Sequence, residues 1–466
     1  MAETSIALNR FGLGARAGQP SPGDPKRWLL DQFGRFDPRP APIAGLPAAA
    51  TLIGMLRDAR DERKDRKSEA KANRAEAAAP GKRTGAMPAP FRDLREQYVS
   101  AVGARTAAAL ASDTPFVERL VHFWANHFAI SVDKIAVVGL AGAFEFEAIR
   151  PHVLGSFGAM LRAVERHPAM LLYLDQAQSI GPGSRLGARA AQRGRERGLN
   201  ENLAREILEL HTLGVRSGYS QGDVTEFARA LTGWTVGGLG RLPALQGSGP
   251  GFTYAEPIHE PGARTILGKR YGQQGEGQAQ AVLDDLAVHP ATARHIATKL
   301  ARHFAADEPP PALVSRLERA FLSSGGDLPS VYRALIEAPE PWSSGPKFRT
   351  PWEWAIGALR GTGVTSLPGA TAAGAFQQLG QAVWKPGSPA GYDDVAPSWA
   401  GPDALYRRIE VAQRIATRAA TVDARQLAGQ LFPGALSEAT RSAIERAESG
   451  QQALALLLAA PEMMRR

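Results

Sequence analysis

One stretch of the chain, residues 199–215, carries more chemically capable side chains than any other segment. It contains two Asn, three Glu, one Arg and one His, and such groups serve proteins as acids, bases and metal ligands. If the stretch is a helix, the period of about 100° per residue places His211 within an apolar arc and Glu206 and Glu209 outside it. The pattern therefore predicts a buried histidine with carboxylates on the opposite side of the same helix.

A second histidine with similar surroundings occurs in residues 115–130, where Pro115 favours the start of a helix. On that helix His127 lies at the centre of an apolar face that also holds Phe123 and Trp124. A single histidine among core residues is usually structural, and that interpretation stays open for each ring. Two such histidines on separate helices favour a shared pocket, in which a neutral imidazole can act as a base or as a metal ligand.

These two helices supply most of the candidate site residues. The candidate catalytic residues are His127, Glu206, Glu209 and His211, and the candidate binding residues are Asn126, Asn202, Arg205 and His259. His259 is included because it lies in the turn 258–262, although a histidine in a turn is often merely exposed to solvent. A divalent metal is a candidate cofactor with His127 and His211 as its ligands, and the sequence leaves its presence and identity open.

A metal held by one helix alone is geometrically unfavourable in this sequence. The spacing of Glu206 and Glu209 resembles the carboxylate pairs of helical metal sites, but those sites place a His three residues after a Glu. His211 follows Glu209 by only two residues and points away from it on a regular helix. The chain also lacks the phosphate-binding loop, the His-Glu-x-x-His motif and the Gly-x-Ser-x-Gly elbow, so none of those catalytic classes is indicated.

The composition limits the class of protein further. The chain of 466 residues is 44% hydrophobic and 22% charged, which is typical of a globular protein with a large core. It has no Cys, and this excludes disulfides and thiolate metal sites. The net charge of +9 is compatible with a nucleic-acid partner. The Arg residues are nevertheless scattered through mixed-charge helices, so solvated helix faces are favoured over nucleic-acid binding.

The apolar runs of the chain are too short for a membrane span. None approaches the roughly 20 residues of a transmembrane helix, so no membrane insertion is predicted. The first 30 residues lack a basic region followed by an apolar one, so no signal peptide is indicated and a cytoplasmic location is predicted. The oligomeric state stays open.

The hydrophobic periodicity predicts an all-α protein, a multi-helix orthogonal bundle with one small β-hairpin insertion near residues 250–270. The β-like runs of that insertion are 252–254 and 264–267. We expect four regions: N-terminal helices in 1–47, a long charged helical arm and loop in 48–90, a main helical domain with the candidate site in 91–345, and a C-terminal helical region packed on it in 346–466.

Two loops and one histidine have alternative interpretations. The Gly- and Arg-rich segment 180–198 is either a flexible surface loop or a lid with an anion-binding role. The aromatic-containing segment 383–402 either closes over a cleft or seals the C-terminal helices, and the second is favoured. His303 shares a helix face with Ile296 and Leu300 and is interpreted as a core residue.

Several long motifs resemble one bacterial protein family. They are residues 7–14 (ALNRFGLG), 121–128 (VHFWANHF), 199–206 (LNENLARE), 209–214 (ELHTLG), 219–234, His259 and 266–268 (ILG). In this order, and over nearly the whole chain, they are similar to the domain-of-unknown-function family 1800. The resemblance implies no particular activity, but members of that family are often encoded beside a second family with a twin-arginine export signal. It therefore implies a co-encoded partner protein and, as an alternative location, the periplasm reached by export with that partner.

Two classes of function remain open. The first is an enzyme of acid–base or metal-assisted hydrolase type, whose cleft is built by helices 115–130 and 199–214. The second is a non-catalytic binding or maturation partner of the co-encoded exported protein, in which the polar helix residues serve as internal hydrogen-bonding groups. Rings of His127 and His211 that turn toward one polar pocket support the enzyme.

Overall fold

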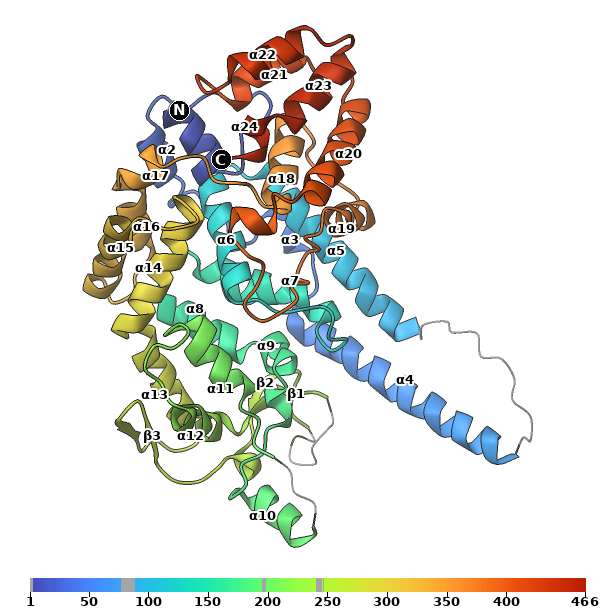
Figure 1. Ribbon diagram of the computed structural model, residues 1–466. Coiled ribbons are helices and arrows are strands. Elements are labelled where there is room, and N and C mark those ends of the chain that lie inside the picture. The colour runs from blue at the N-terminus through green and yellow to red at the C-terminus, as the bar shows by residue number, and fades with distance from the viewer. Residues whose placement is uncertain (1–2, 77–88, 195–197, 240–244, 246) are drawn as a thin grey trace.

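The computed structural model describes residues 3–76, 89–194, 198–239, 245 and 247–466, and these form a mainly helical protein with two small sheets (Figure 1). This confirms the all-α fold class. The first helices are α1 (Glu3–Ile6), the π-helical turn η1 (Ala7–Phe11), α2 (Pro25–Leu30), α3 (Ala41–Ala44), α4 (Ala49–Glu76) and α5 (Ala89–Ala111). None of the helices in the described ranges is long and apolar enough to span a membrane.

The helices around the candidate site follow in the middle of the chain. They are α6 (Pro115–His127), α7 (Ala141–Phe144), η3 (Glu145–Ile149), α8 (Phe157–Arg166), α9 (Pro168–Tyr173), α10 (Arg185–Gln192), α11 (Asn202–Glu206), η6 (Ile207–His211), α12 (Gln221–Leu231), α13 (Glu276–Ala287), α14 (Pro290–Phe304), α15 (Pro311–Ser323), α16 (Leu328–Glu337) and α17 (Glu340–Ser343). Short 3-10 turns join them at η2 (Val138–Leu140), η4 (Arg150–His152), η5 (Gln176–Gln178) and η8 (Glu256–Ile258).

The C-terminal helices lie above α6 in Figure 1 and complete the molecule. They are α18 (Pro351–Gly361), α19 (Gly369–Gln378), α20 (Pro402–Arg418), α21 (Ala424–Leu431), α22 (Glu438–Glu445), α23 (Gly450–Ala459) and α24 (Pro461–Met464), with the 3-10 turn η9 (Ala396–Ser398) in the loop before α20. Proline occupies the first turn of α6, α14, α18 and α20, where its fixed φ suits a helix and its missing N–H costs no hydrogen bond.

One large apolar core holds the fold together. Its buried side chains run from Ile6 near the start of the described chain to Met464 near its end. At its centre the ring of Phe116 on α6 packs edge-on against Phe304 on α14, with the ring centroids 5.6 Å apart. Because both helices bury an apolar face in the same core, their polar faces border the same space. The division into four regions stays a prediction.

The β-structure consists of two separate antiparallel pairs. Strand β1 (Trp234–Gly237) pairs with β2 (Gly251–Tyr254), and β3 (Arg264–Ile266) pairs with β4 (Lys269–Tyr271). Both predicted β-like runs are therefore strands, but they do not pair with each other. The turn with His259 lies between β2 and β3. It does not close a hairpin, because β3 pairs with β4, the strand that follows it after two residues.

The long charged helix expected in the N-terminal part is α4, which lies beside α5 and protrudes from the body of the molecule (Figure 1). Its first turns bury Leu52, Ile53 and Leu56 against the core. Farther out, the charged side chains of residues 63–66 are exposed. Most of the loop predicted for 80–90 lies outside the described residues.

The motif-rich segment forms a shorter and less regular helix than the period predicts. It begins as α11 and continues from Ile207 as the π-helical turn η6, which ends at His211. A π turn has i→i+5 hydrogen bonds, so it shifts the residues that follow away from their α-helical positions. Gly214 then ends the segment with a φ of 94°, as expected for a glycine after a helix.

Candidate active site

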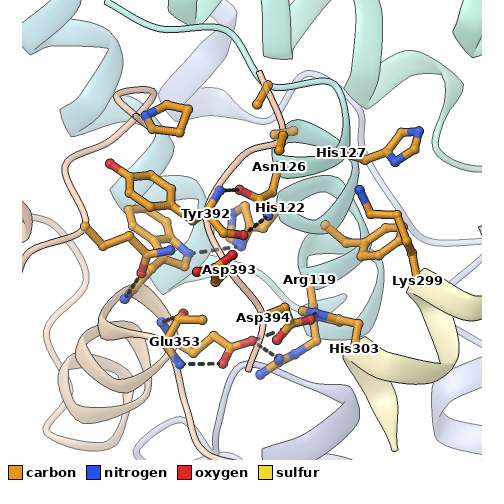
Figure 2. Close-up of a pocket in the computed structure, with 18 of the residues that line it drawn as sticks. Arg119, His122, Asn126, His127, Lys299, His303, Glu353, Tyr392, Asp393 and Asp394 are labelled. Carbon is orange, nitrogen blue, oxygen red and sulfur yellow. Dashed lines mark hydrogen bonds and ion pairs between the residues drawn. The ribbon is translucent and has the colours of Figure 1, made fainter. Parts of the chain in front are cut away.

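A polar cavity of about 360 Å³ lies between α6, α14, the start of α18 and the loop 381–395 (Figure 2). Its polar lining consists of Arg105, Arg119, His122, Asn126, His127, His295, Thr298, Lys299, Arg302, His303, Thr350, Glu353, Gln381, Tyr392, Asp393 and Asp394. Phe123, Trp352 and Trp384 supply aromatic wall. The volume is at the lower end of the range for small-molecule sites, so the cavity suits a small polar ligand.

The helix α14 presents three titratable side chains to this cavity in a row. His295, Lys299 and His303 follow one another at intervals of four residues. Residues four apart lie on the same face of a helix, with Cβ atoms about 5–6 Å apart. On the facing helix α6, Arg119, Phe123 and His127 have the same spacing and also line the cavity.

The two imidazoles nearest the motif-rich segment are oriented by its last carbonyl groups. His127 Nε2 lies 3.2 Å from the carbonyl oxygen of His211, and His295 Nε2 lies 3.1 Å from that of Leu210. A carbonyl can only accept, so each ring donates from Nε2 and, when neutral, carries its lone pair on Nδ1. The end of η6 therefore fixes the tautomer of both rings.

Both of these rings are held neutral. Burial lowers the pKa of His127 well below its usual value, and the charge of Lys299 adds to the effect. Burial and Lys299 likewise lower the pKa of His295 to about 4. At neutral pH the two rings act as uncharged hydrogen-bonding groups beside an ammonium.

His211 itself is buried behind this wall. Its Nδ1 donates to Glu165 Oε1 over 2.7 Å, and neither side chain is exposed. The ring centroids of His127 and His211 are 6.3 Å apart. The two rings are therefore neighbours, as expected, but only His127 lines the cavity, and His211 contacts His127 through its main-chain carbonyl.

At the other end of α14, His303 belongs to a buried ionic network (Figure 2). Its Nδ1 donates to Asp394 Oδ2 over 2.6 Å. Glu353 lies beside it and binds the guanidinium groups of Arg119 at 2.5 Å and Arg466 at 3.1 Å. His303 is 9% exposed. The interpretation of His303 as a core residue therefore fits its burial, but the ring also binds a carboxylate that lines the cavity.

The carboxylates of this network stay ionised because cations surround them. Burial alone would raise the pKa of Glu353, but Arg466 and Arg119 lower it to about 2. Burial acts in the same direction on Asp394, and His303, Arg466 and Lys347 lower its pKa. These negative charges are thus already compensated by protein groups.

Lys299 differs from every charged group of that network. Its side chain is half-buried, and its amine end reaches from α14 toward His127 in Figure 2. Among the described residues, no hydrogen bond or ion pair involves its amine. Burial lowers the pKa of Lys299 to about 8, with Asp394 opposing the shift and Arg302 adding to it.

The loop 381–395 forms the remaining wall and is fastened to α6. The side-chain amide of Asn126 donates to the carbonyl of Tyr392 and accepts from its N–H, both over 2.8 Å. Gly391 has a φ of 84°, and a Cβ there would lie 2.3 Å from the carbonyl oxygen of Asn126. Only glycine permits this approach. Of the two interpretations of 383–402, lining a cavity is the one that these contacts fit.

The candidate residues of the sequence lie in three places. Asn126 and His127 line the cavity. Glu206 and Glu209 are half-buried on α11 and η6 outside the lining, where burial raises the pKa of Glu206 and Tyr219 donates to Glu209 over 3.1 Å. Asn202 is exposed.

The other two candidate binding residues are engaged elsewhere. Arg205 pairs with Glu201 at 3.1 Å. His259 Nδ1 donates to the carbonyl of Thr232 over 2.7 Å. The adjoining segment 180–198 contains the helix α10, and Gly183 within it donates to Glu260 over 2.6 Å. Arg195 and Arg197 of that segment lie outside the described residues, and its roles as a lid or an anion site stay predictions.

Lys299, His295, Glu353 and Asp394 did not enter the sequence-based candidate set. The spacing of four on α14 is a usable signal for the first two. Glu353 is also visible as the fourth residue of a capping box, since it accepts from Thr350 N–H over 3.0 Å. For Asp394 no local signal exists, because its partners come from distant segments.

No group of three or more His, Asp or Glu side chains in the described part of the chain is arranged to hold a metal ion. The proposed ligands His127 and His211 each use one ring nitrogen in the hydrogen bonds given above. Their other nitrogens, Nδ1 and Nε2, have no hydrogen-bond partner, so a metal between them stays a prediction.

The fold and the cavity together define a helical protein with a buried ionic network beside a polar pocket. The chain belongs to the family described as "Protein of unknown function (DUF1800)", whose model matches residues 6–465. This confirms the resemblance seen in the motifs. No curated protein and no solved structure matches the chain.

Proposed function

We propose that this protein is an acid–base enzyme of hydrolase type that works in the cavity between α6 and α14, with Lys299 as the group that exchanges a proton with the substrate. The observation that carries the proposal is the amine of Lys299, which borders the cavity without a hydrogen bond or ion pair among the described residues. A pKa of about 8 makes both the ammonium and the free amine accessible near neutral pH.

The surroundings of Lys299 suit proton transfer. His127 and His295 are neutral and add no charge that would hold the ammonium. The carboxylates of Glu353 and Asp394 are bound by other cations. Lys299 therefore remains available to a ligand, and the tautomer of His127 leaves its Nδ1 without a hydrogen bond among the described residues.

Amine labelling tests this proposal without knowledge of the substrate. We expect 2,4,6-trinitrobenzenesulfonate to modify Lys299 with a half-maximal rate near pH 8, as followed by peptide mass spectrometry. Lys269, an exposed lysine paired with Asp285 at 2.5 Å, is the comparison. Labelling of Lys299 no faster than that of Lys269 at pH 7.5 contradicts the proposal.

Turnover of a panel of p-nitrophenyl esters provides the functional readout. Loss of a proton-transfer group costs about 10²–10⁴-fold in rate, so Lys299→Met should lower kcat/KM by that amount. Lys269→Met is the matched control and should leave kcat/KM unchanged. A Lys299→Met protein that is folded and as active as the wild type overturns the assignment.

We also propose a partner-protein role for the α4–α5 arm, because it protrudes from the body of the molecule and its outer charged residues 63–66 are exposed. The family resemblance supplies the partner, a co-encoded exported protein. Replacing residues 61–92 by a short Gly-Ser linker should abolish co-purification of that protein while Lys299 labelling is retained. Retained co-purification contradicts this role. Cell fractionation with and without the partner distinguishes a cytoplasmic location from export in its company.

A further inference from the structure

Two cations of α14 border the cavity without a carboxylate partner. Lys299 and Arg302 are three residues apart and both line it, so their side chains lie on one face of the helix. Arg302 donates from Nε to the carbonyl of Asp307 over 3.1 Å. No ion pair of either side chain exists among the described residues.

The carboxylates of the lining form no ion pair with these cations among the described residues. Glu353 and Asp394 are bound by the cations already described. Asp393 is exposed at the rim and accepts from the hydroxyl of Ser398 over 2.8 Å. An anionic group of a ligand would therefore find unpaired positive charge along α14.

A lysine in this situation is also a nucleophile. Burial and a neighbouring cation both disfavour the ammonium, and this combination activates lysine amines toward carbonyl carbons. The adjoining rings of His127 and His295 are neutral and contribute no negative charge. Phe123, Trp352 and Trp384 give the cavity an aromatic wall.

We propose that the amine of Lys299 forms an imine with a small aldehyde or ketone that carries a carboxylate, and that Arg302 binds this carboxylate. The inference rests on the proposed function, in which the same amine is reactive. The Cβ atoms of residues three apart on a helix are about 5–6 Å from each other, so both side chains can reach one small ligand, and we take a 2-oxo acid as the probe.

The step is balanced without a further reactant. The nitrogen lone pair of the free amine attacks the carbonyl carbon and forms a C–N bond, while the carbonyl π pair moves to oxygen. A proton passes from nitrogen to that oxygen through a solvent water molecule. The hydroxyl then takes a second proton from solvent and leaves as water, as the remaining nitrogen lone pair forms the C=N bond. The protonated imine returns one proton to solvent, so the overall change is loss of one water.

Reductive trapping tests the inference on the full-length protein. Glyoxylate and sodium cyanoborohydride should add one group to the wild type, which peptide mass spectrometry should locate on Lys299. Lys299→Arg should lose this adduct, and Lys269→Arg, the matched control, should keep it. The wild-type peptide map by itself decides the site if Lys299→Arg fails to fold.

The carboxylate part is tested with a second variant and an uncharged probe. A hydrogen bond to a charged group contributes about 1.5–3 kcal/mol, so Arg302→Met should slow trapping of glyoxylate by about tenfold or more. It should slow trapping of propanal less, because for this uncharged probe only the effect of Arg302 on the pKa of Lys299 is lost. Equal slowing of both probes overturns the role of Arg302 as the carboxylate-binding residue.

The outcomes separate this inference from the proposed function. Trapping that modifies Lys269 as fast as Lys299, or that spares Lys299, overturns imine formation. If Lys299 nevertheless reacts with 2,4,6-trinitrobenzenesulfonate near pH 8, the acid–base proposal stands alone. A lysine that reacts with neither reagent overturns both.

Discussion

At the scale of single residues, the role of each histidine at the site depends on the group that accepts its hydrogen bond. His127 and His295 donate to main-chain carbonyls, whereas His211 and His303 donate to carboxylates. Burial and the charge of Lys299 keep the first pair neutral, and the second pair links the site to the core. The same residue type thus performs different tasks because its hydrogen-bond partners differ.

The Glu165–His211 pair predicts a stability effect. Glu165→Ala leaves the buried Nδ1 of His211 without an acceptor, and such a group costs about 1–3 kcal/mol. We expect urea denaturation to show this loss in the free energy of unfolding. Glu308→Ala, at an exposed position without hydrogen bonds among the described residues, should change it by less than about 0.5 kcal/mol. Equal values for the two variants contradict a structural role of the pair.

His295 predicts how stability depends on pH. Its pKa is about 4 in the folded protein, against 6.5 for the free side chain, so the unfolded chain binds the proton more readily between these values. The stabilising contribution is complete above pH 6.5 and is lost as the pH falls toward 4. Between pH 7 and pH 5 the loss should reach about 2 kcal/mol.

The variant His295→Gln isolates this contribution, because an amide can still donate to Leu210 but does not titrate. The free energy of unfolding should fall less steeply between pH 7 and pH 5 for the variant than for the wild type, as measured by urea denaturation. Identical slopes indicate that His295 does not supply the pH dependence.

At the scale of elements, the loop 381–395 has no regular structure and depends on its anchors. Asp394 binds His303, Lys347 and Arg466, whereas its neighbour Asp393 binds only exposed groups. Ion pairs and hydrogen bonds of the Asp394 side chain therefore position the loop, and regular backbone hydrogen bonding within the loop does not.

Asp394→Asn should loosen this loop. The substitution removes the charge that binds Lys347 and Arg466 and accepts from His303, so we expect faster amide hydrogen exchange in 383–395 by mass spectrometry, with exchange in α6 unchanged. Asp393→Asn is the matched control at the adjacent position and should leave exchange as in the wild type. Equal exchange in the two variants contradicts anchoring through Asp394.

At the scale of the whole molecule, buried arginines join the two ends of the described chain to its centre. Arg10 of η1 donates to the carbonyls of Pro341 and Arg466. The backbone of Arg466 pairs in turn with Lys347, over 2.8 and 2.7 Å. Residues from near both ends thus support the helix α18 that presents Glu353 to the cavity.

Arg466→Ala should destabilise the entire fold. Removing one partner of a buried ionic network leaves Glu353 and Asp394 less compensated, and such changes cost about 3–5 kcal/mol. Arg465→Ala removes the exposed neighbour and should cost under about 0.5 kcal/mol. Urea denaturation compares the two, and a loss of similar size for both excludes a special role of the Arg466 side chain.

The predictability of this protein differs between its helices and its site. Helix positions follow from apolar spacing and caps, such as the capping box that Ser220 and Asp223 form at the start of α12. The π turn at Ile207 was not predictable from the spacing of the apolar residues. A single shifted backbone hydrogen bond changes which side of the helix the later residues occupy, and it leaves no mark in the amino-acid sequence.

The sequence by itself determined that the protein is helical, that His127 and His211 are buried, and which family it belongs to. Those properties depend on local spacing and on long ordered motifs. Only the tertiary structure decided that Lys299 has no hydrogen-bond or ion-pair partner among the described residues and that Asp394 faces His303. Charges separated by about ninety residues meet only when the chain is packed, and burial then sets their protonation.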